Sequence, residues 1–555
     1  MEGATDLQYT EVPCQRQVAD SSPTNNQFAQ GTQDYSFTIG KGMAFYPSRS
    51  YFKFTVKLNG TGRFYDAGGP FGVGGKPAIS EQLALSENFA PNMYTSMYFL
   101  GGGQNISSIV NYLPQVNQVE TRATGSQAWL KSVGMSAAYS NPNFSSRVNA
   151  VSAALANTDQ NAGNNENLSF ESRGVYGLSL EEGKTSYRKP IAATATFATA
   201  TITDNHTTTF VGTGTALLGS DVGSTLVVGG YYFNVVDIAP PAGGTQAITV
   251  DKISNRLAGF ITTDWYLIAR NLTTSTEGHS VIQSTWFPSC LGIFNEKSPL
   301  GAGDYRLQLS PDANYKINAI ESVLPGYVGH SFQVLDVKFY ACVARFMIPD
   351  QVRPLYLTEY QAQSKVMSTN AQNLSWTVPA STYELYVFLQ SGVAGNSVAF
   401  PPSKFQAENN AEQNLVRIQC TYANVSRPQT LLETGFTNNI NGGTSLETSN
   451  NLLTQLYTSS LLETDRYDLE GGAESFNDFL ARGPMYVWKW AKSEFDLSTQ
   501  VQLQIEYSAN SGSVEQDVTT PFPTNSRVFL VAKYTRTVNI TTQGGMVVAV
   551  NTLNV

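Results

Sequence analysis

The sequence predicts an all-β protein built from two similar antiparallel domains in tandem. Three observations carry this prediction. Apolar and polar residues alternate with period two in strand-length stretches along the chain, polar or turn-rich segments separate these stretches, and one pattern of residues recurs in the second half. Connections without regular 10 to 15 residue helices favour antiparallel sandwiches or barrels over parallel α/β units.

The clearest strand signal lies in residues 51–58, where four apolar residues alternate with Lys53, Thr55 and Lys57. Such alternation is typical of a strand with one buried face. The same pattern predicts strands at 305–309, 332–346, 383–389, 415–422, 501–507 and 527–540. The stretch 485–490 places Tyr486, Trp488 and Trp490 on one face, which indicates a core strand, with a sugar or base platform as the alternative.

Helical periodicity stands out against this background in two places. One is the stretch 86–98, which is followed by three glycines at 101–103. The other comprises 449–462 and 468–480. Each predicts one or two short helices next to glycine breaks.

The residues downstream of these helices predict an internal duplication. A tryptophan leads to a Lys-Ser pair and then to a Leu-Gln pair, which lies 10 residues after the lysine in the first half and 11 in the second. The matching residues are Trp286, Lys297 and Leu307 in the first half and Trp488, Lys492 and Leu503 in the second. Two similar β domains explain the match most simply, and chance is the alternative.

Two segments account for much of the extra length of the first half. Residues 141–182 are rich in Asn, Ser and Ala and predict a long exposed loop. Residues 196–256 predict a compact β module, in which the Gly229–Gly230 pair is typical of a tight hairpin turn. This module resembles small β modules of phage and viral surface proteins.

Composition and charge limit the possible functions. Only 14% of the 555 residues are charged, against about 25% in an ordinary soluble domain. The net charge of −9 argues against a broad nucleic-acid-binding face. The four cysteines form no Cys-x-x-Cys pair, the first residues lack the features of a secretory signal, and no apolar run approaches the length of a membrane helix. We therefore expect no transmembrane segment and no specific nucleic-acid site.

Candidate chemical motifs favour no enzyme. The glycine-rich stretch 68–76 lacks the residues of a phosphate loop, and His206, His279 and His330 have no ligand spacing. A cluster of carboxylates could serve a glycosidase, but a solvated helix face is the preferred interpretation. That cluster comprises Glu463, Asp465, Asp468, Glu470 and Glu474. We expect no catalytic residue, no cofactor and no metal site.

Taken together, these features resemble the double jelly-roll major capsid proteins of virophages and polinton-like viruses, in the adenovirus hexon-like lineage. The resemblance rests on the two tandem β domains with their helices and on a few motifs. These are Phe479–Trp488, Lys492, Val501–Ile505 and Asn88–Ser96. It covers about residues 35–550, and the inserted module departs from the minimal family pattern.

The resemblance implies two tandem eight-stranded antiparallel jelly rolls with short helices. It implies a homotrimer with a pseudo-hexagonal outline in an icosahedral virion shell. The implied partners are neighbouring trimers, penton proteins and minor capsid proteins. The insertions of the first domain are expected to form an outward tower. The expected domains are an N-terminal segment at 1–34, acting as a strap, a first jelly roll at 35–348 and a second at 349–555. The alternative function is a viral or bacterial adhesin that binds carbohydrate.

Overall fold

The computed structural model of the chain describes residues 6–61, 83–126, 129, 133–134, 186–189, 196–202, 208–213, 217, 225–228, 231–250, 261–262, 265–270, 277–322, 332–407, 411–412, 415–433, 445–465, 474, 476–490, 499–507 and 525–553. The glycine-rich stretch 68–76, the stretch 141–182, His206 and His330 lie outside these residues.

The first half of the chain forms two facing antiparallel sheets. Their strands are β1 (Leu7–Pro13), β2 (Gln33–Ile39), β3 (Met43–Phe45), β4 (Tyr51–Thr61), β6 (Tyr94–Gly101), β7 (Gln104–Ile109), β16 (Glu277–Trp286), β17 (Gly303–Pro311) and β19 (Phe332–Arg345). One sheet has the order β1-β19-β4-β16, with β3 also paired to β19, and the other has the order β2-β17-β6-β7. Leaving β3 aside and counting along the chain, these orders are 1-8-3-6 and 2-7-4-5, which is the connectivity of a jelly roll.

The second half repeats this connectivity. Its strands are β20 (Gln351–Val366), β21 (Ala371–Thr377), β22 (Thr382–Gln390), β23 (Leu415–Tyr422), β24 (Val425–Glu433), β25 (Met485–Lys489), β26 (Gln500–Tyr507), β27 (Arg527–Gln543) and β28 (Met546–Leu553). The sheets β20-β27-β22-β25 and β21-β26-β23-β24 again give 1-8-3-6 and 2-7-4-5, and β28 pairs with β27. The predicted fold of two tandem jelly rolls is confirmed.

The duplication noticed in the sequence corresponds to equivalent strands. Trp286 ends β16 and Trp488 lies in β25, each the sixth strand of its jelly roll. The Leu-Gln pairs at Leu307 and Leu503 lie on β17 and β26, each the seventh strand, and both leucines are buried. The strand predictions at 51–58, 305–309, 332–346, 383–389, 415–422, 501–507 and 527–540 are confirmed.

The helix prediction is confirmed in part in both halves. Most of the stretch 86–98 belongs to the four-residue helix α2 (Phe89–Asn92) and to β6, whose alternating burial is that of a strand. The main helix of this half is α3 (Leu113–Thr124). In the second half, α9 (Ser445–Glu463) includes the predicted 449–462, and α10 (Phe476–Arg482) overlaps the end of 468–480.

Both main helices lie in the connection between the fifth and sixth strands of their jelly rolls, which run from β7 to β16 and from β24 to β25. The remaining short elements are η1 (Gln27–Ala29), η2 (Pro47–Arg49), α7 (Gly292–Asn295), α8 (Tyr315–Asn318) and the paired strands β5 (Leu83–Leu85) and β18 (Ile320–Ser322).

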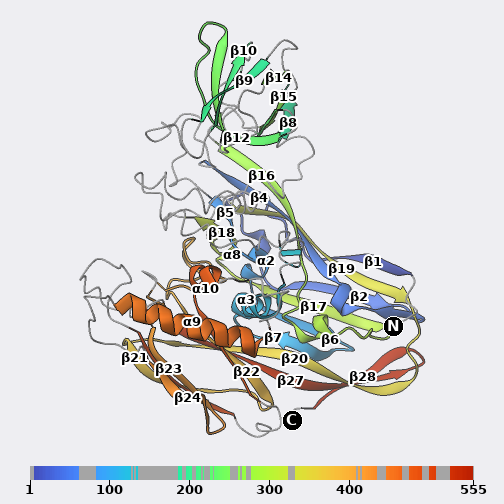
Figure 1. Ribbon diagram of the computed structural model, residues 1–555. Helices are drawn as coiled ribbons and strands as arrows, with labels where there is room; N and C mark the ends of the chain where they lie inside the picture. The colour runs from blue at the N-terminus through green and yellow to red at the C-terminus, as the bar shows by residue number, and fades with distance from the viewer. Residues whose placement is uncertain are drawn as a thin grey trace.

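The same connection in the first half holds an additional β module. Its strands are β8 (Ser186–Lys189), β9 (Thr196–Ile202), β10 (Thr208–Thr213), β11 (Thr225–Val228), β12 (Tyr231–Ile238), β13 (Thr245–Val250), β14 (Ile261–Thr262) and β15 (Trp265–Arg270). They form one sheet around a separate small core that contains Phe210 and Phe233. The module lies beyond the ends of β4 and β16, away from the jelly rolls (Figure 1). Strands on both sides of the predicted range 196–256 contribute to it.

The described part of the N-terminal segment adds a strand to the first jelly roll, and its role as a strap stays a prediction. Residues 7–13 form β1, which pairs antiparallel with β19 from Leu7 opposite Ala344 to Pro13 opposite Lys338. Because β1 is the first strand of the jelly-roll order, this part of the segment belongs to the first jelly roll.

One sheet of the second jelly roll is buried on both faces over most of β22 and β25. In β25, Tyr486 and Trp488 face the core of the second jelly roll, whereas Met485 and Val487 belong to the core that is continuous with the first. The sheet therefore serves as the shared wall between the two jelly rolls, and helix α3 lies against it (Figure 1).

Candidate functional site: the seam between the jelly rolls

The two jelly rolls meet along an extensive buried contact, which we call the seam. Its apolar part is a group of rings in which Phe388 stacks between Phe405 and Phe529, with centroid distances of 3.6 and 5.1 Å. Tyr112, at the start of α3, meets Phe529 edge-on at 5.1 Å. Aromatic pairs add directional attraction to the burial of apolar area, so the Tyr112–Phe529 contact ties the start of α3 to this ring group of the second jelly roll.

Helix α3 supplies the polar part of the seam from the first jelly roll. Its residues from Leu113 to Ala123 are all buried, including polar ones. Trp286 anchors the helix to β16 by donating a hydrogen bond of 3.0 Å to Asn117. Since a helix buried on all sides must satisfy its polar side chains internally, the partners of these side chains define the seam.

Arg122 of α3 crosses to the second jelly roll. Its Nε lies 3.0 Å from Oε1 of Glu474, and its Nη1 donates a hydrogen bond of 2.9 Å to the Gly483 carbonyl. The guanidinium carbon lies 5.3 Å from the centre of the Phe405 ring. The side chain of Arg122 is fully buried, so its charge depends on these contacts for compensation.

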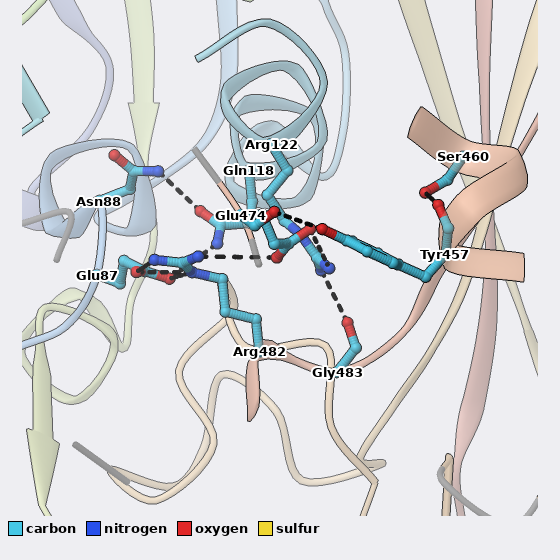
Figure 2. Close-up of polar contacts among 9 residues, drawn as sticks. All are labelled: Glu87, Asn88, Gln118, Arg122, Tyr457, Ser460, Glu474, Arg482 and Gly483. Carbon is cyan, nitrogen blue, oxygen red and sulfur yellow. Dashed lines mark hydrogen bonds and ion pairs between the residues drawn. The ribbon is translucent and has the colours of Figure 1, made fainter. Parts of the chain in front are cut away.

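A second buried arginine belongs to the second jelly roll. Arg482, at the end of α10, lies 3.0 Å from Glu87 through Nη2 and 3.7 Å from Glu474 through Nη1. Figure 2 shows the four charged side chains, from Arg122 through Glu474 and Arg482 to Glu87, arranged in an alternating row. We call these four residues the seam cluster. Two positive and two negative charges compensate one another within it.

Neutral groups hold the carboxylates of the cluster in place. Gln118 donates to Glu87 at 3.0 Å and accepts from Asn88 at 2.7 Å. On the other side, the Tyr457 hydroxyl donates to the backbone carbonyl of Glu474 at 2.9 Å, and Ser460 donates to the Tyr457 carbonyl at 2.7 Å (Figure 2). Helices α3 and α9, which occupy equivalent connections, thus both contribute to one network.

Position 483, where the backbone approaches Arg122, requires a glycine. Its φ of +93° lies in the region that disfavours other residues, and a Cβ there would be 1.5 Å from the Phe405 carbonyl oxygen. Only glycine therefore permits the backbone approach that brings its carbonyl to Arg122.

A buried carboxyl group, Glu359 of β20, faces the first jelly roll elsewhere along the seam. Its Oε1 accepts a hydrogen bond from Ser107 of β7, and burial raises the pKa of Glu359 to about 7. A Cβ on Gly292 of α7 would lie 2.4 Å from the Thr358 carbonyl oxygen, so the two jelly rolls are in backbone contact here.

Main-chain hydrogen bonds also join the two halves. The Ala302 amide donates to the Gly545 carbonyl at 3.1 Å, and the Val547 amide donates to the Ala302 carbonyl at 2.8 Å. The turn between β27 and β28 is thereby attached to the segment before β17. Ring packing, ion pairs and backbone bonds together hold the two jelly rolls as a single block.

The structure disperses the carboxylates singled out in the sequence. Glu463 accepts from the Lys489 amide at 3.1 Å, Asp465 pairs with the Lys489 ammonium at 3.0 Å, and Glu474 belongs to the seam cluster. Asp468 and Glu470 lie outside the described residues. The interpretation as a solvated helix face is wrong for Glu474, whose side chain is only 10% exposed because it compensates two buried arginines.

The aromatic stretch 485–490 is a core strand, as the alternation predicted. Tyr486, Trp488 and Trp490 are buried in the second jelly roll, and the opposite face is covered by the first. The alternative of an exposed ring platform is therefore wrong. His279 lies in β16 opposite Asn59, within the sheet ladder.

The described part of the chain holds no group of three or more His, Cys, Asp or Glu side chains placed to bind a metal ion. Among the described residues, no helix combines the length and the apolar character needed to cross a membrane. What the seam cluster can do is mechanical: buried charges with fixed partners allow one relative arrangement of the two jelly rolls and penalise others.

Sequence reasoning missed Glu87, Arg122 and Arg482. The spacing of Leu113, Val116 and Val119 after a tyrosine-leucine-proline start carries a helical signal that could have located α3. No local pattern could have paired Arg122 with Glu474, because 352 residues separate them.

No protein-family profile matches the chain, and no curated protein matches it by sequence. The fold is similar to that of a chain in the Sputnik virophage structure, with 10% identity, a TM-score of 0.47 and coverage of 100% of this chain and 89% of that one. It is also similar to the PBCV-1 virus capsid (8% identity, TM-score 0.41, coverage 98% and 97%) and to the mavirus major capsid protein (9% identity, TM-score 0.41, coverage 98% and 90%). At such identities the function has to be argued from the residues of this chain.

Proposed function

We propose that this chain is a major capsid protein, three copies of which form a pseudo-hexagonal capsomer that tiles an icosahedral shell. The observation that carries the proposal is the pairing of two jelly rolls with the same strand order, fixed side by side by the seam. A non-enzymatic role fits this arrangement, since the most elaborate polar site of the described residues is closed and serves to hold the two halves together.

Geometry links this block to a shell. Three chains around a threefold axis present six similar barrels, and six similar units around an axis approximate a hexagon. Hexagons fill a surface with few gaps, and closed symmetric assembly is the rule for soluble homo-oligomers. The seam matters here because tiling requires the angle between the two barrels to be the same in every copy.

The additional module distinguishes one end of the paired jelly rolls from the other. β16 enters the jelly roll from the module side at Glu277 and ends at Trp286. The module lies beyond the jelly rolls at that first end (Figure 1). We assign this end to the outer surface of the shell, where long insertions can be accommodated without disturbing contacts between barrels.

An uncharged surface on the second jelly roll is suited to contacts between copies. β20, β27 and β28 pair along their length, and one face of this part carries side chains that are exposed or half-buried. We call this face the β20 flank. It consists of Val352, Pro354, Tyr356, Thr537, Asn539, Thr541, Ala549 and Asn551. Val352 is 65% exposed and Tyr356 67%.

The composition of the β20 flank matches that of protein interfaces. Interface centres are depleted in Lys, Glu and Asp and enriched in tyrosine, and none of these eight side chains carries a charge. We infer that a second copy packs on the β20 flank. The further partners are neighbouring trimers, penton proteins and minor capsid proteins, and the location is the virion shell.

Light scattering on the purified chain tests the proposal. A trimer of chains of 60.3 kDa has a mass of about 181 kDa. Tyr356→Lys introduces a charge at the centre of the β20 flank and should weaken self-association by at least about tenfold while leaving the melting temperature of the chain unchanged. Ser375→Lys, on exposed β21 of the opposite sheet, is the matched control and should leave the mass unchanged. A chain that stays monomeric at high concentration would contradict the proposal.

A further inference from the structure

A groove with a volume of about 850 Å³ lies where the two jelly rolls join. Its walls come from η2, from the segment after β16, from α7 and from the connection between β19 and β20. β4 begins opposite the end of β16, with Phe52 paired to Trp286. The groove is therefore at the end of the first jelly roll that is far from the inserted module.

The groove is positively charged in a chain that is negative overall. Arg49, Lys297 and Arg353 line it, and no aspartate or glutamate does, whereas the whole chain carries a net charge of −9. Acidic side chains lie next to the lining rather than in it: the charge of Glu296 acts on Arg353, and Glu120 accepts a hydrogen bond from Ser289. Concave walls concentrate this local positive potential.

The cationic side chains of the groove keep N–H donors available for a ligand. Among the described residues, Arg49 and Lys297 are exposed and make no ion pair. Arg353 donates one hydrogen bond of 2.9 Å to the Pro299 carbonyl through Nη2, and its Nε is buried. A guanidinium has five N–H donors in a planar fork that fits a carboxylate, so Arg353 can bind an anion in two-point fashion.

The remaining lining combines polar side chains with apolar rings. Phe346 is 42% exposed, and Phe287, Pro288, Pro299 and Pro349 add further ring surfaces. Grooves lined with aromatic and proline rings favour extended peptides, whose side chains enter while the backbone stays stiff. Cations beside such walls select a segment that combines carboxylates with apolar residues.

We propose that this groove binds an extended acidic peptide segment of a partner protein. Charge complementarity with the three cations favours it, and the groove has the size for a few side chains rather than for a nucleic-acid duplex. The net charge of the chain also repels a polyanion at long range more than a short peptide with few charges. These features of the groove are independent of the assembly proposed above.

Fluorescence anisotropy with a defined probe tests the proposal. The probe is a short fluorescein-labelled peptide that alternates aspartate with phenylalanine and proline, and the matched neutral peptide has asparagine in place of aspartate. The acidic peptide should bind, with an affinity that falls as ionic strength rises, and the neutral peptide should bind at least about tenfold more weakly. Equal binding of both peptides, or no binding of the acidic one, overturns the proposal.

Substitutions locate the binding. Arg49→Gln combined with Lys297→Gln should weaken binding of the acidic peptide by at least about tenfold. Lys41→Gln, an exposed position outside the groove lining, is the control and should have no effect. Because the two-peptide comparison uses the unaltered chain, it tests the proposal even if the double variant folds poorly.

The proposal is also overturned if inorganic phosphate or a single-stranded oligonucleotide displaces the peptide more readily than unlabelled peptide does. A double variant that changes the oligomeric state of the chain would instead assign the groove to a second copy.

Discussion

The seam and the β20 flank are both β-rich contact surfaces, yet they use opposite chemistry. The seam buries two arginines and two glutamates in an alternating row. The side chains of the β20 flank are all uncharged. Both contacts lie on the same sheet of the second jelly roll, on its two faces.

This difference reflects when each contact forms. The seam joins two parts of one chain, so every buried charge finds its partner during folding and selects a single arrangement. A contact between separate copies must remove water from both surfaces each time it forms, and desolvating charges costs more than desolvating uncharged groups. An uncharged flank therefore suits repeated assembly, and a charged seam suits a permanent joint.

The most severe way to break the seam is to substitute Gly483. In Gly483→Ala the new Cβ meets the Phe405 carbonyl at 1.5 Å in a left-handed backbone conformation. We expect a loss of about 4 kcal/mol or more in the free energy of unfolding, measured by denaturant titration. Gly102→Ala is the control, because Gly102 also has a positive φ, of +55°, but has open space around it. A similar small loss in both variants would show that the Phe405 contact is not decisive.

Removing one charge of the seam cluster is the next test. Arg122→Met leaves Glu474 buried with Arg482 at 3.7 Å as its remaining cation, and should destabilise the chain by about 3 kcal/mol. Adding Glu474→Gln should restore part of the loss, since the uncompensated charge is then gone. Additive losses in this double-mutant cycle, followed by thermal and denaturant unfolding, would contradict the coupling of the two side chains.

The pH dependence of stability distinguishes the two surfaces, because the seam contains a buried carboxyl group and the β20 flank contains no charged side chain. The pKa of Glu359 is raised from 4.5 to about 7, so between these values the folded protein keeps a proton that the unfolded chain has released. The contribution of Glu359 to stability should therefore fall as pH rises through this window and level off above about 7, by an amount on the order of 3 kcal/mol.

Glu359→Gln isolates this contribution. Burial also raises the pKa of Glu412 to about 8, which adds to the loss in the same direction. The variant should thus show a smaller fall in melting temperature between pH 5 and 8 than the unaltered chain, not a flat profile. Identical profiles for the two proteins would exclude Glu359 as a titrating group of the seam.

The smallest effect is expected from the inserted module, which has its own core and lies away from the jelly rolls (Figure 1). Replacement of residues 186–270 by a short Gly-Ser linker should change the unfolding free energy of the jelly rolls by less than about 1 kcal/mol and leave the trimer intact. A glycan array on both proteins addresses the adhesin alternative. Glycan binding that disappears with the module, in a chain that does not trimerise, would favour the adhesin.

The fold could be predicted from the sequence where one face of a strand is buried. The alternation in 51–58 and 501–507 predicted strands that the structure confirms, and the tryptophan and Leu-Gln spacing identified equivalent strands in the two halves. Prediction succeeded only in part at 86–98, where the helix is limited to the four residues of α2 and β6 begins at Tyr94.

The seam could not be predicted in the same way. Helix α3 has the apolar and polar faces of a surface helix in its sequence, yet the structure buries both faces, so its polar residues looked solvent-exposed. Glu474 looked like a surface carboxylate because its main partner, Arg122, becomes a neighbour only when the two jelly rolls pack together. The domain boundaries at 34 and 348 remain predictions.

Electron microscopy of the purified, unaltered chain tests the central claim most directly. We predict threefold particles with a pseudo-hexagonal outline of six similar lobes, with a protrusion from one end of each chain, and sheets or shells of these particles at high concentration. Uniform particles of the size of a single chain, with no lattice at any concentration, would contradict the claim.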